Sequence, residues 1–369
     1  MTASSSEPSF PELTLPQMLR EHARRSPHRT AVRQKDFGIW NPISWADYFE
    51  RAAAVGHGYT ALGLGQGGHV AVLSENRIEW VLAQLGAGLV GAVTIGVYPT
   101  SPANEVAYVL EHSDAEIIVC EDQEQVDKVI EVRDQLPLLK RIVVVEVKGM
   151  RAYPADLVVS FEALERAGAA HRAENPALVE EALSRQTLAD MALMIYTSGS
   201  TGKPKGAMLS YGNIRAQAAA IVEKLGLGPE TTHLSYLPLC HVAEQMTTLM
   251  APVYLGSQIN FGESIRTVQE DLREVAPSMF LGVPRIWEKL HSSIHIRMLE
   301  TGGLRRRLFE WACAACEPFA ETPRRERSLG QRLRYAVAYL LVFRALQNYV
   351  GLRRARVAMT GAAPISPRI

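Results

Sequence analysis

A short stretch between residues 195 and 206 carries a high density of chemically active groups. It contains four aliphatic hydroxyls, three glycines and two lysines, in the order Ile195-Tyr-Thr-Ser-Gly-Ser-Thr-Gly-Lys-Pro-Lys-Gly206. Glycines allow positive φ angles and close approach to a ligand, and successive amide N–H groups in such a turn form a concave anion site. Hydroxyls and lysines add rotatable donors and positive charge. The stretch therefore predicts a polyphosphate site.

Apolar runs on both sides of this stretch, 191–195 and 207–209, predict a polar loop held between two buried strands. The loop is not a Walker A loop, because Pro204 follows Gly202-Lys203 and Gly206 would interrupt a helix there. The alternative is a Gly/Ser-rich surface turn that binds nothing. Two lysines placed between buried strands favour the phosphate site.

The segment from Tyr196 to Gly206 resembles the phosphate loop of the adenylate-forming superfamily, whose usual form is Tyr-Thr-Ser-Gly-Ser/Thr-Thr-Gly-x-Pro-Lys-Gly. Every position of that pattern is matched. The superfamily includes acyl-CoA synthetases, luciferases and the adenylation domains of peptide synthetases. The resemblance implies that the β and γ phosphates of ATP contact Ser198, Gly199, Ser200 and Thr201, and that Gly202 also belongs to the nucleotide site. It also implies that Lys205 is the fixed cation and that Thr197 contacts Mg²⁺.

Three further segments resemble parts of the same superfamily. The small residues Gly361, Ala362, Ala363 and Pro364 follow an expected strand and match its adenine-binding Gly-x-Ala-Pro segment. Residues 238–245 match a segment beside the acyl pocket, which implies that His241 lines the acyl-carboxylate site; a purely structural histidine at a helix start is the alternative. Residues 283–289 are similar to the long-chain acyl-CoA synthetase branch, where Arg285 is a candidate anion contact, with a helix-capping or ion-pair role as the alternative.

The reaction implied by the resemblance joins a fatty acid to ATP, giving acyl-adenylate and pyrophosphate, after which CoA displaces AMP. Mg²⁺ and lysines would offset the repulsion between the carboxylate and the triphosphate. Three family features are absent from this chain: the downstream Tyr-Gly-x-Thr-Glu segment, the ribose-binding Asp and the mobile C-terminal lid domain. The chain is therefore expected to be an N-terminal fragment, with little or no ligase activity by itself.

Two other functions stay open at this point. One is an acyl-AMP ligase or a carrier-protein-loading adenylation domain of the same superfamily. The other is a non-catalytic module that binds a nucleotide or docks on a membrane.

Composition excludes several classes of protein. Lysine plus arginine and aspartate plus glutamate both number 39, so no global field attracts nucleic acid. Four scattered cysteines are too few for a disulfide framework, which fits a reduced cytoplasmic setting. The charge-free run 80–98 contains four glycines and a β-like end, so a buried helix and a buried strand are expected there instead of a membrane span. The resemblance leaves homodimer formation open.

Strand and helix patterns alternate along most of the chain, which predicts an α/β fold of two layered subdomains with mostly parallel sheets. Residues 1–12 are expected to be a flexible N-terminus and 13–369 an incomplete AMP-binding domain, with a subdomain boundary near 170–190. A hairpin is expected at 30–45, and helix caps are expected at Ser44, Ser101 and Ser210. Strands are expected at 69–73, 92–97, 115–119, 141–147, 190–197, 231–237, 257–261, 278–281 and 356–360.

The region 305–356 is helical in pattern and strongly basic, with twelve arginines against four glutamates. Between the charges lies the apolar run 335–343, too short to span a bilayer. Basic surface beside exposed apolar residues would give peripheral contact with an anionic membrane, at the inner membrane surface for a cytoplasmic protein. The alternative, which the pattern favours, is that the apolar run packs in a core and the arginines form a solvated face.

Overall fold

The computed structural model describes residues 12–197 and 202–366 and divides into two compact units. The first unit comprises the chain up to residue 231 together with 235–265, and the second comprises 232–234 and the chain from 266 onward. The boundary expected near residues 170–190 stays a prediction about subdomains. The four cysteines are free in the structure.

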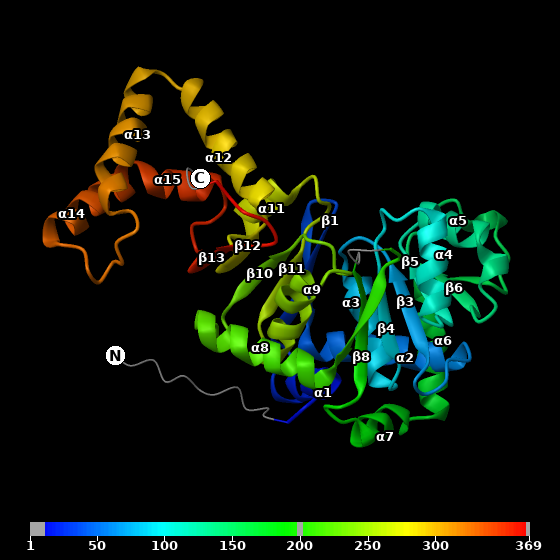
Figure 1. Ribbon diagram of the computed structural model, residues 1–369. Helices are drawn as coiled ribbons and strands as arrows, with labels where there is room; N and C mark the ends of the chain where they lie inside the picture. The colour runs from blue at the N-terminus through cyan, green and yellow to red at the C-terminus, as the bar shows by residue number, and fades with distance from the viewer. Residues whose placement is uncertain (1–11, 198–201, 367–369) are drawn as a thin grey trace. The chain divides into compact units, whose positions relative to one another are not determined.

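A seven-stranded sheet forms the centre of the first unit (Figure 1). Six of its strands pair in parallel and the last, β9, pairs antiparallel with β8. This confirms the mostly parallel α/β fold. The short strand β7 was not expected from the sequence. The sheet order is β7 (Val158–Ser160), β6 (Arg141–Val144), β5 (Ile117–Cys120), β3 (His69–Leu73), β4 (Val93–Val97), β8 (Met191–Thr197) and β9 (Lys205–Ser210).

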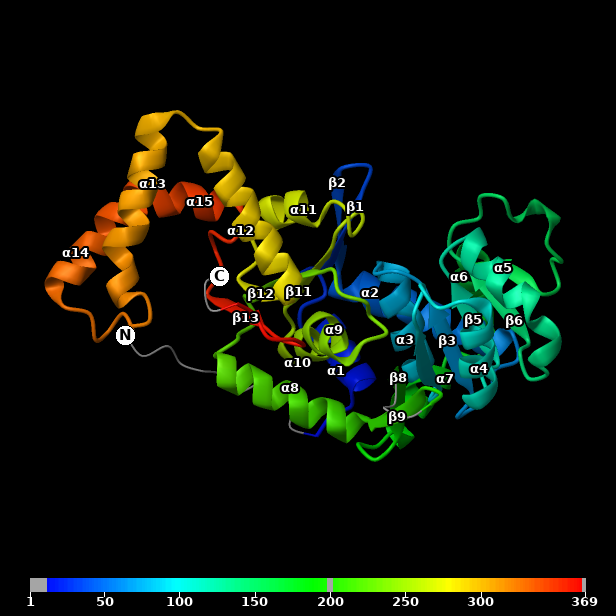
Figure 2. The same cartoon turned by 45° about the horizontal axis from the view of Figure 1, so that its top comes forward.

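Alternate residues of the central strands enter two different hydrophobic cores, because successive side chains of a strand point to opposite faces. Val70 and Val72 join the larger core, whereas Ala71 and Leu73 join the smaller one. Helices α4 (Ala103–His112) and α5 (Gln123–Glu131) complete the smaller core. Helices α2 (Trp45–Ala61), α3 (Ile78–Leu89), α6 (Phe161–Glu174) and α8 (Tyr211–Leu225) contribute to the larger one. Figure 2 shows these helices from a second side.

The run 80–98 is the buried helix α3 followed by the buried strand β4, as expected. Among the described residues, the structure contains no helix whose length and apolar character would allow it to cross a bilayer.

The expected hairpin is present as β1 (Thr30–Asp36) and β2 (Ile39–Ser44), and β1 also pairs in parallel with β11 (Gln258–Phe261).

The Ser44 and Ser210 hydroxyls cap α2 and α8, as predicted. The predicted Ser101 cap is wrong. Helix α4 begins at Ala103, and Pro102 with its extended backbone takes the cap position, so Ser101 lies one residue too early to cap the first turn.

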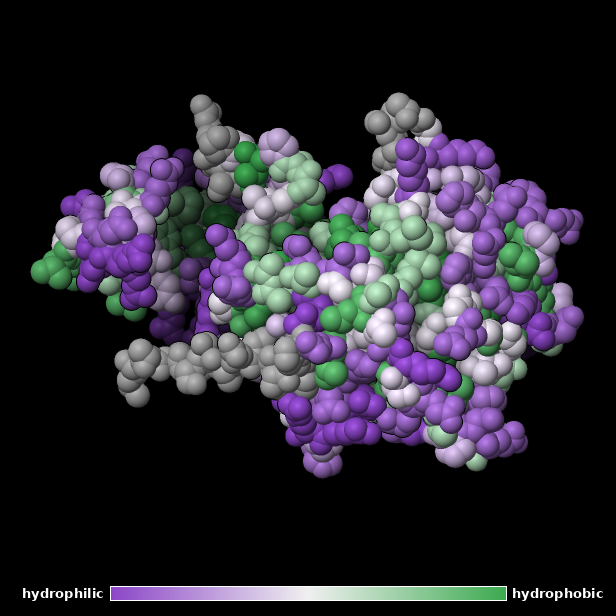
Figure 3. All heavy atoms as spheres, turned by 60° about the horizontal axis from the view of Figure 1, so that its bottom comes forward, coloured by the Kyte–Doolittle hydropathy of each residue, from purple (hydrophilic) through white to green (hydrophobic). Residues whose placement is uncertain are grey.

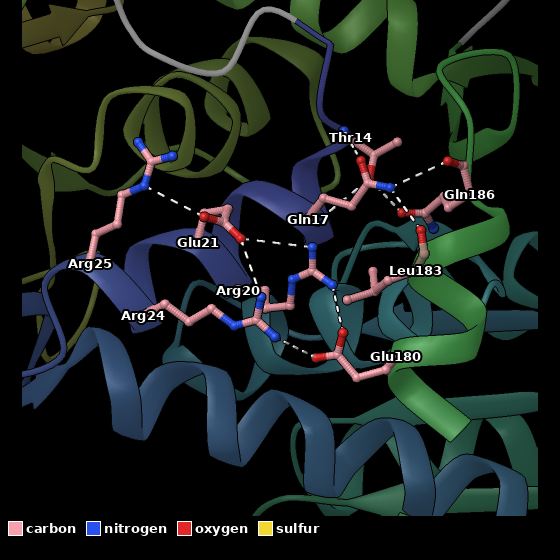
Figure 4. Close-up of polar contacts among 9 residues, drawn as sticks. All are labelled: Thr14, Gln17, Arg20, Glu21, Arg24, Arg25, Glu180, Leu183 and Gln186. Carbon is pink, nitrogen blue, oxygen red and sulfur yellow. Dashed lines mark hydrogen bonds and ion pairs between the residues drawn. The ribbon is translucent and has the colours of Figure 1, made fainter. Parts of the chain in front are cut away.

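Polar contacts join α1 (Leu15–Arg25) to α7 (Leu178–Arg185), the helix that precedes β8 (Figure 4). Arg20 Nη1 lies 2.7 Å from Glu180 Oε2, and Gln17 Nε2 donates to the Leu183 carbonyl at 2.8 Å. Gln186 accepts from the Thr14 hydroxyl and donates to the Gly88 carbonyl at 3.0 Å. These bonds fix the chain a few residues before it enters β8.

The second unit is mainly helical, with one two-stranded parallel sheet of β12 (Met279–Gly282) and β13 (Val357–Thr360). Its helical part has a small core of its own, which includes Ala312, Phe319 and Val342. Its helices are α11 (Val268–Val275), α12 (Pro284–Leu299), α13 (Gly303–Cys316), α14 (Leu329–Ala338) and α15 (Arg344–Tyr349). The segment β10 (Thr232–Ser235) straddles the division of the chain into units.

Candidate active site

The predicted phosphate loop connects β8 to β9 at the carboxyl end of the parallel strands, the edge where open α/β sheets bind ligands. Thr197 is the last residue of β8 and Lys205 the first of β9, and the two are paired across the hairpin. Both side chains are exposed. Ser198, Gly199, Ser200 and Thr201 lie outside the described residues, so their predicted phosphate contacts stay predictions. Gly202 has φ +138°, a backbone conformation that favours glycine.

The expectation that the loop lies between two buried strands holds for β8 and is wrong for β9. Five consecutive residues of β8 are buried, whereas β9 has only exposed and half-buried residues. The reason is its position, because β9 is the edge strand of the sheet and has a neighbour on one side only. The loop thus joins a buried strand to a solvated one.

Side chains under the hairpin hold its base in place. The Tyr108 hydroxyl donates to the Pro204 carbonyl at 3.0 Å, and Lys203 Nζ lies 4.7 Å from the centre of the Tyr108 ring. The Tyr196 hydroxyl lies 2.8 Å from His112 Nδ1, and burial raises the Tyr196 pKa to about 12. Because its ammonium lies over the Tyr108 ring, Lys203 is held by a cation–π contact. Lys205, by contrast, is exposed to solvent.

Glycine at position 206 allows the tyrosine before the loop to pack against the opposite strand. Gly206 pairs with Tyr196, and a Cβ at this position would lie 3.2 Å from the tyrosine ring and 2.9 Å from Met194 Sδ. A larger residue would push the ring away from β9 and widen the hairpin below the loop.

The first part of a second predicted segment, residues 238–241 of 238–245, lies over the switch point of the same sheet. The helices that follow β3 and β4 pack into different cores, so the connections after these neighbouring strands diverge at this point. Asn76, just beyond β3, accepts from the Leu239 N–H at 3.0 Å. A Cβ at Gly96 of β4 would lie 2.9 Å from Cys240 Cα, so the segment rests directly on the strand.

A buried carboxyl group fixes the approach to this segment. Glu244 is fully buried in α9 (Val242–Glu244) and accepts from the Ser235 hydroxyl at 2.7 Å, the Thr248 hydroxyl at 2.6 Å and the Tyr236 N–H at 3.1 Å. The Asn76 amide donates to Ser235 Oγ at 2.8 Å. Burial raises the Glu244 pKa to about 7, and the hydrogen bonds to its carboxylate oppose that rise. The network ties β3 to the segment and to the helix after it.

His241 has a helix-capping role. Its side-chain Nδ1 accepts from the Ala243 N–H at 3.1 Å, and the imidazole is exposed at the start of α9. The helix continues as a π-helical stretch, Gln245–Met250, and then as α10 (Ala251–Leu255). The structural alternative weighed from the sequence is therefore realised, and contact of His241 with an acyl carboxylate stays a prediction.

The predicted adenine-binding residues follow β13 in the second unit. Gly361 is half-buried, whereas Ala362, Ala363 and Pro364 are exposed. Ala362 has φ +70°, a conformation that costs a non-glycine residue about 1 kcal/mol or more and that is often found at binding sites.

A tryptophan braces the strand that leads to these residues. Trp287 Nε1 donates to the carbonyls of Gly282 at 2.9 Å and Met359 at 3.2 Å, so it ties β12 and β13 together just before residue 361. Arg285 is exposed in the first turn of α12, and its side chain neither caps the helix nor forms an ion pair with another residue of 12–197 and 202–366.

The structure thus brings Thr197 and Lys205 together and ties the backbone before His241 to β3 of the same sheet. Gly361 to Pro364 belong to the other unit, so their relation to the loop is not assigned. Sequence reasoning missed Asn76, Glu244 and Trp287. A weak signal existed for Asn76, which follows the carboxyl end of a buried strand, and for Glu244, an isolated acid in the otherwise uncharged stretch 242–255.

The Mg²⁺ implied by the family fits this site only through oxygen donors. The described part of the chain contains no group of three or more His, Cys, Asp or Glu side chains arranged to hold a metal ion. Thr197 offers one exposed hydroxyl. Because Mg²⁺ keeps several waters and binds substrate phosphates, a single hydroxyl beside a triphosphate is compatible with it.

Comparison with known proteins agrees with these features. The profile of the family described as "AMP-binding enzyme" matches residues 19–369. A curated protein of Xenopus laevis described as "Long-chain-fatty-acid--CoA ligase ACSBG2" is 32% identical over 366 residues, covering 97% of this chain and 49% of that protein. The chain spans about half the length of the curated relatives it matches.

Solved structures show the same fold. A long-chain-fatty-acid-CoA ligase from Archaeoglobus fulgidus matches with a TM-score of 0.65 at 17% identity, covering 97% of this chain and 59% of that one. A fatty acyl-adenylate ligase from L. pneumophila, solved with acyl adenylate and pyrophosphate, matches with a TM-score of 0.61 at 16% identity, covering 96% and 50%. Because the family profile covers almost the whole sequence, the chain belongs to the family of AMP-binding enzymes.

Proposed function

We propose that the protein carrying this chain activates a long-chain fatty acid with ATP, forming acyl-adenylate and pyrophosphate, and then transfers the acyl group to CoA. The observation that carries this proposal is the β8–β9 hairpin, which presents Thr197 and Lys205 side by side at the two ends of a glycine- and hydroxyl-rich loop. The family membership and the names of the curated relatives support it.

The central physical task of this reaction is to bring a carboxylate anion to a triphosphate. Two like charges about 4 Å apart repel by roughly 4 kcal/mol at an effective dielectric constant near 20. We assign Lys205 and the loop residues 198–201 to the β and γ phosphates, because N–H groups, hydroxyls and an ammonium stabilise the charge of departing pyrophosphate. Mg²⁺ bound beside Thr197 would supply further charge neutralisation.

The remaining roles concern the other reactants. His241, at the start of α9 over the switch point, would line the acyl-carboxylate site. Gly361, Ala362, Ala363 and Pro364 would form a shelf for adenine, since small side chains let a flat ring lie against the backbone. For the cell, we propose a cytoplasmic protein with peripheral contact at the inner membrane surface through the basic 305–356 region.

The test is a pyrophosphate-release assay with a panel of carboxylic acids on the complete gene product. We expect release with long-chain fatty acids and a fall of about 10²–10³-fold in Lys205→Ala, the size of effect seen when one electrostatic contact to a transition state is removed. Lys148→Ala is the matched control, because Lys148 is exposed and distant in sequence from the loop. Absence of release with every acid would overturn the proposal and favour a non-catalytic nucleotide-binding module.

A second candidate function is supported by the structural likeness to a fatty acyl-adenylate ligase. In that case the adenylate would form but its acyl group would pass to an acceptor other than CoA, such as a carrier protein. Supplying CoA to the adenylate formed from ATP and the acid separates the two: a CoA thioester with release of AMP supports the ligase, and an adenylate that forms no such thioester supports the alternative.

A further inference from the structure

An exposed apolar stripe runs along α14 and the π-helical turn that continues it, Tyr339–Phe343. Leu329, Leu333, Val337 and Leu340 are 83%, 68%, 40% and 66% exposed. Spacings of four, four and three residues place them on one face of a helix. The opposite face already packs inward through residues such as Ala338 and Val342. The stripe therefore does not contribute to the small core of the helical part.

Arginines flank this stripe on both sides. Arg332 and Arg334 directly precede and follow Leu333, so a turn of 3.6 residues places them about 100° to either side of it. Both are exposed. The sequence from 327 to 369 contains no aspartate or glutamate. An apolar ridge with a long cationic side chain on either side is typical of helices that lie in a membrane interface, where arginines extend toward the headgroups.

A recess beside the same helix has the chemistry of an anion site. Its volume is about 820 Å³, and its lining consists of Arg324, Arg325, Arg327, Arg332, Tyr335, Ala336 and Tyr339. The Arg327 guanidinium is held 5.1 Å from the centre of the Tyr335 ring and donates to the Thr322 carbonyl at 2.9 Å. Arg332 donates to the Arg325 carbonyl at 3.0 Å. Guanidinium groups fixed in this way suit phosphate oxygens.

We propose that Leu329, Leu333, Val337 and Leu340 insert into the interface of an anionic lipid bilayer, while the flanking arginines and the arginine-lined recess bind lipid phosphates. The structure corrects the favoured expectation that the whole apolar run 335–343 packs in a core. Part of this run faces solvent, because Leu340 and Leu341 are more than half exposed. The charge of the helix selects lipid over a second copy of this chain, since two such arginine-rich faces would repel each other. This inference rests on the peripheral contact proposed above and names the surface that makes it.

Vesicle co-sedimentation of the 369-residue chain without ATP tests the proposal, so its failure leaves the ligase proposal untouched. Vesicles of phosphatidylcholine are compared with vesicles in which about a third of the lipid is phosphatidylglycerol. We expect binding to the anionic vesicles that weakens as salt increases. We expect the double variants Leu333→Ser/Leu340→Ser and Arg332→Gln/Arg334→Gln each to bind at least about tenfold more weakly. Leu138→Ser is the control, since Leu138 is 51% exposed in the first unit, and it should bind like the unchanged chain.

A second measurement does not depend on the stability of these variants. Leu333→Cys in a Cys313→Ser background carries an environment-sensitive fluorophore, whose emission should shift to shorter wavelength only with anionic vesicles. Equal binding by all variants, no binding by the unchanged chain, or no emission shift would overturn the proposal. Sedimentation of the chain as a dimer that Leu333→Ser/Leu340→Ser converts to a monomer would also overturn it, because the stripe would then join two copies.

Discussion

Replacing Glu244 by glutamine should remove a pH dependence from the stability of the protein. The Glu244 carboxyl is fully buried, and its pKa is raised from 4.5 to about 7. A pKa raised in the folded state means that folding binds protons between these two values. The stability contributed by this group is thus fully present below about pH 4.5 and is lost as the pH rises through 7.

The size of the effect follows from the two pKa values. One pH unit of difference corresponds to about 1.4 kcal/mol, so ionised Glu244 should lower the free energy of unfolding by about 3 kcal/mol at pH 8 relative to pH 4.5. Glutamine has a similar shape but does not titrate. The difference in stability between the unchanged chain and Glu244→Gln should therefore change by about 3 kcal/mol across this range, whatever constant offset the substitution adds.

Urea denaturation at closely spaced pH values from 4.5 to 8 measures this difference. The stability of Glu244→Gln must be subtracted from that of the unchanged chain at each pH, because other groups act in the opposite direction. Burial lowers the pKa values of His22 and His233 to about 4, so the stability that these histidines contribute is lost as the pH falls. Glu223→Gln, at an exposed position of α8, is the control and should follow the unchanged chain. If Glu244→Gln and Glu223→Gln show the same pH profile, the assigned burial and ionisation of Glu244 are wrong.

Two substitutions test other contacts of the site. Gly96→Ala should lower the free energy of unfolding by about 1–2 kcal/mol in a urea titration, because the new Cβ would lie 2.9 Å from Cys240 Cα. This crowding exceeds the gain from the lower entropy of the unfolded chain. The control Gly65→Ala, whose Cβ meets no atom within 4 Å, should be nearly neutral in the same titration. Trp287→Phe should lower the stability of the second unit by about 1–2 kcal/mol in thermal melting, because two hydrogen bonds to backbone carbonyls are lost. The control Trp311→Phe, at a more exposed position, should show no such loss. A neutral Gly96→Ala or Trp287→Phe would contradict the contact it removes.

The features that sequence reasoning predicted well are those set by neighbouring residues. The hairpin 30–44 depends on a short turn between two β-rich runs, and the Ser44 and Ser210 caps depend on hydrogen bonds three residues away. The buried pair α3 and β4 follows from an uncharged run interrupted by glycines. Local periodicity carries this information because each feature is complete within about twenty residues.

The features that sequence reasoning missed depend on contacts between distant segments. Asn76 meets Leu239 and Ser235 across about 160 residues, and no pattern around either segment encodes the pairing. The solvated character of β9 follows from its place at the sheet edge, which the apolar run 207–209 does not reveal. The inward and outward faces of the run 335–343 likewise separate only once the helix that carries them has packed.

The separate cores of the two units have a consequence for how the molecule opens. The central strands of the first unit each feed two hydrophobic layers, so neither layer can loosen without exposing the other. The helices of the second unit rest on a much smaller cluster. In native-state hydrogen exchange, the amides of β3, β4 and β8 should share one slow rate set by global unfolding, while those of α13 and α14 exchange earlier through a local opening.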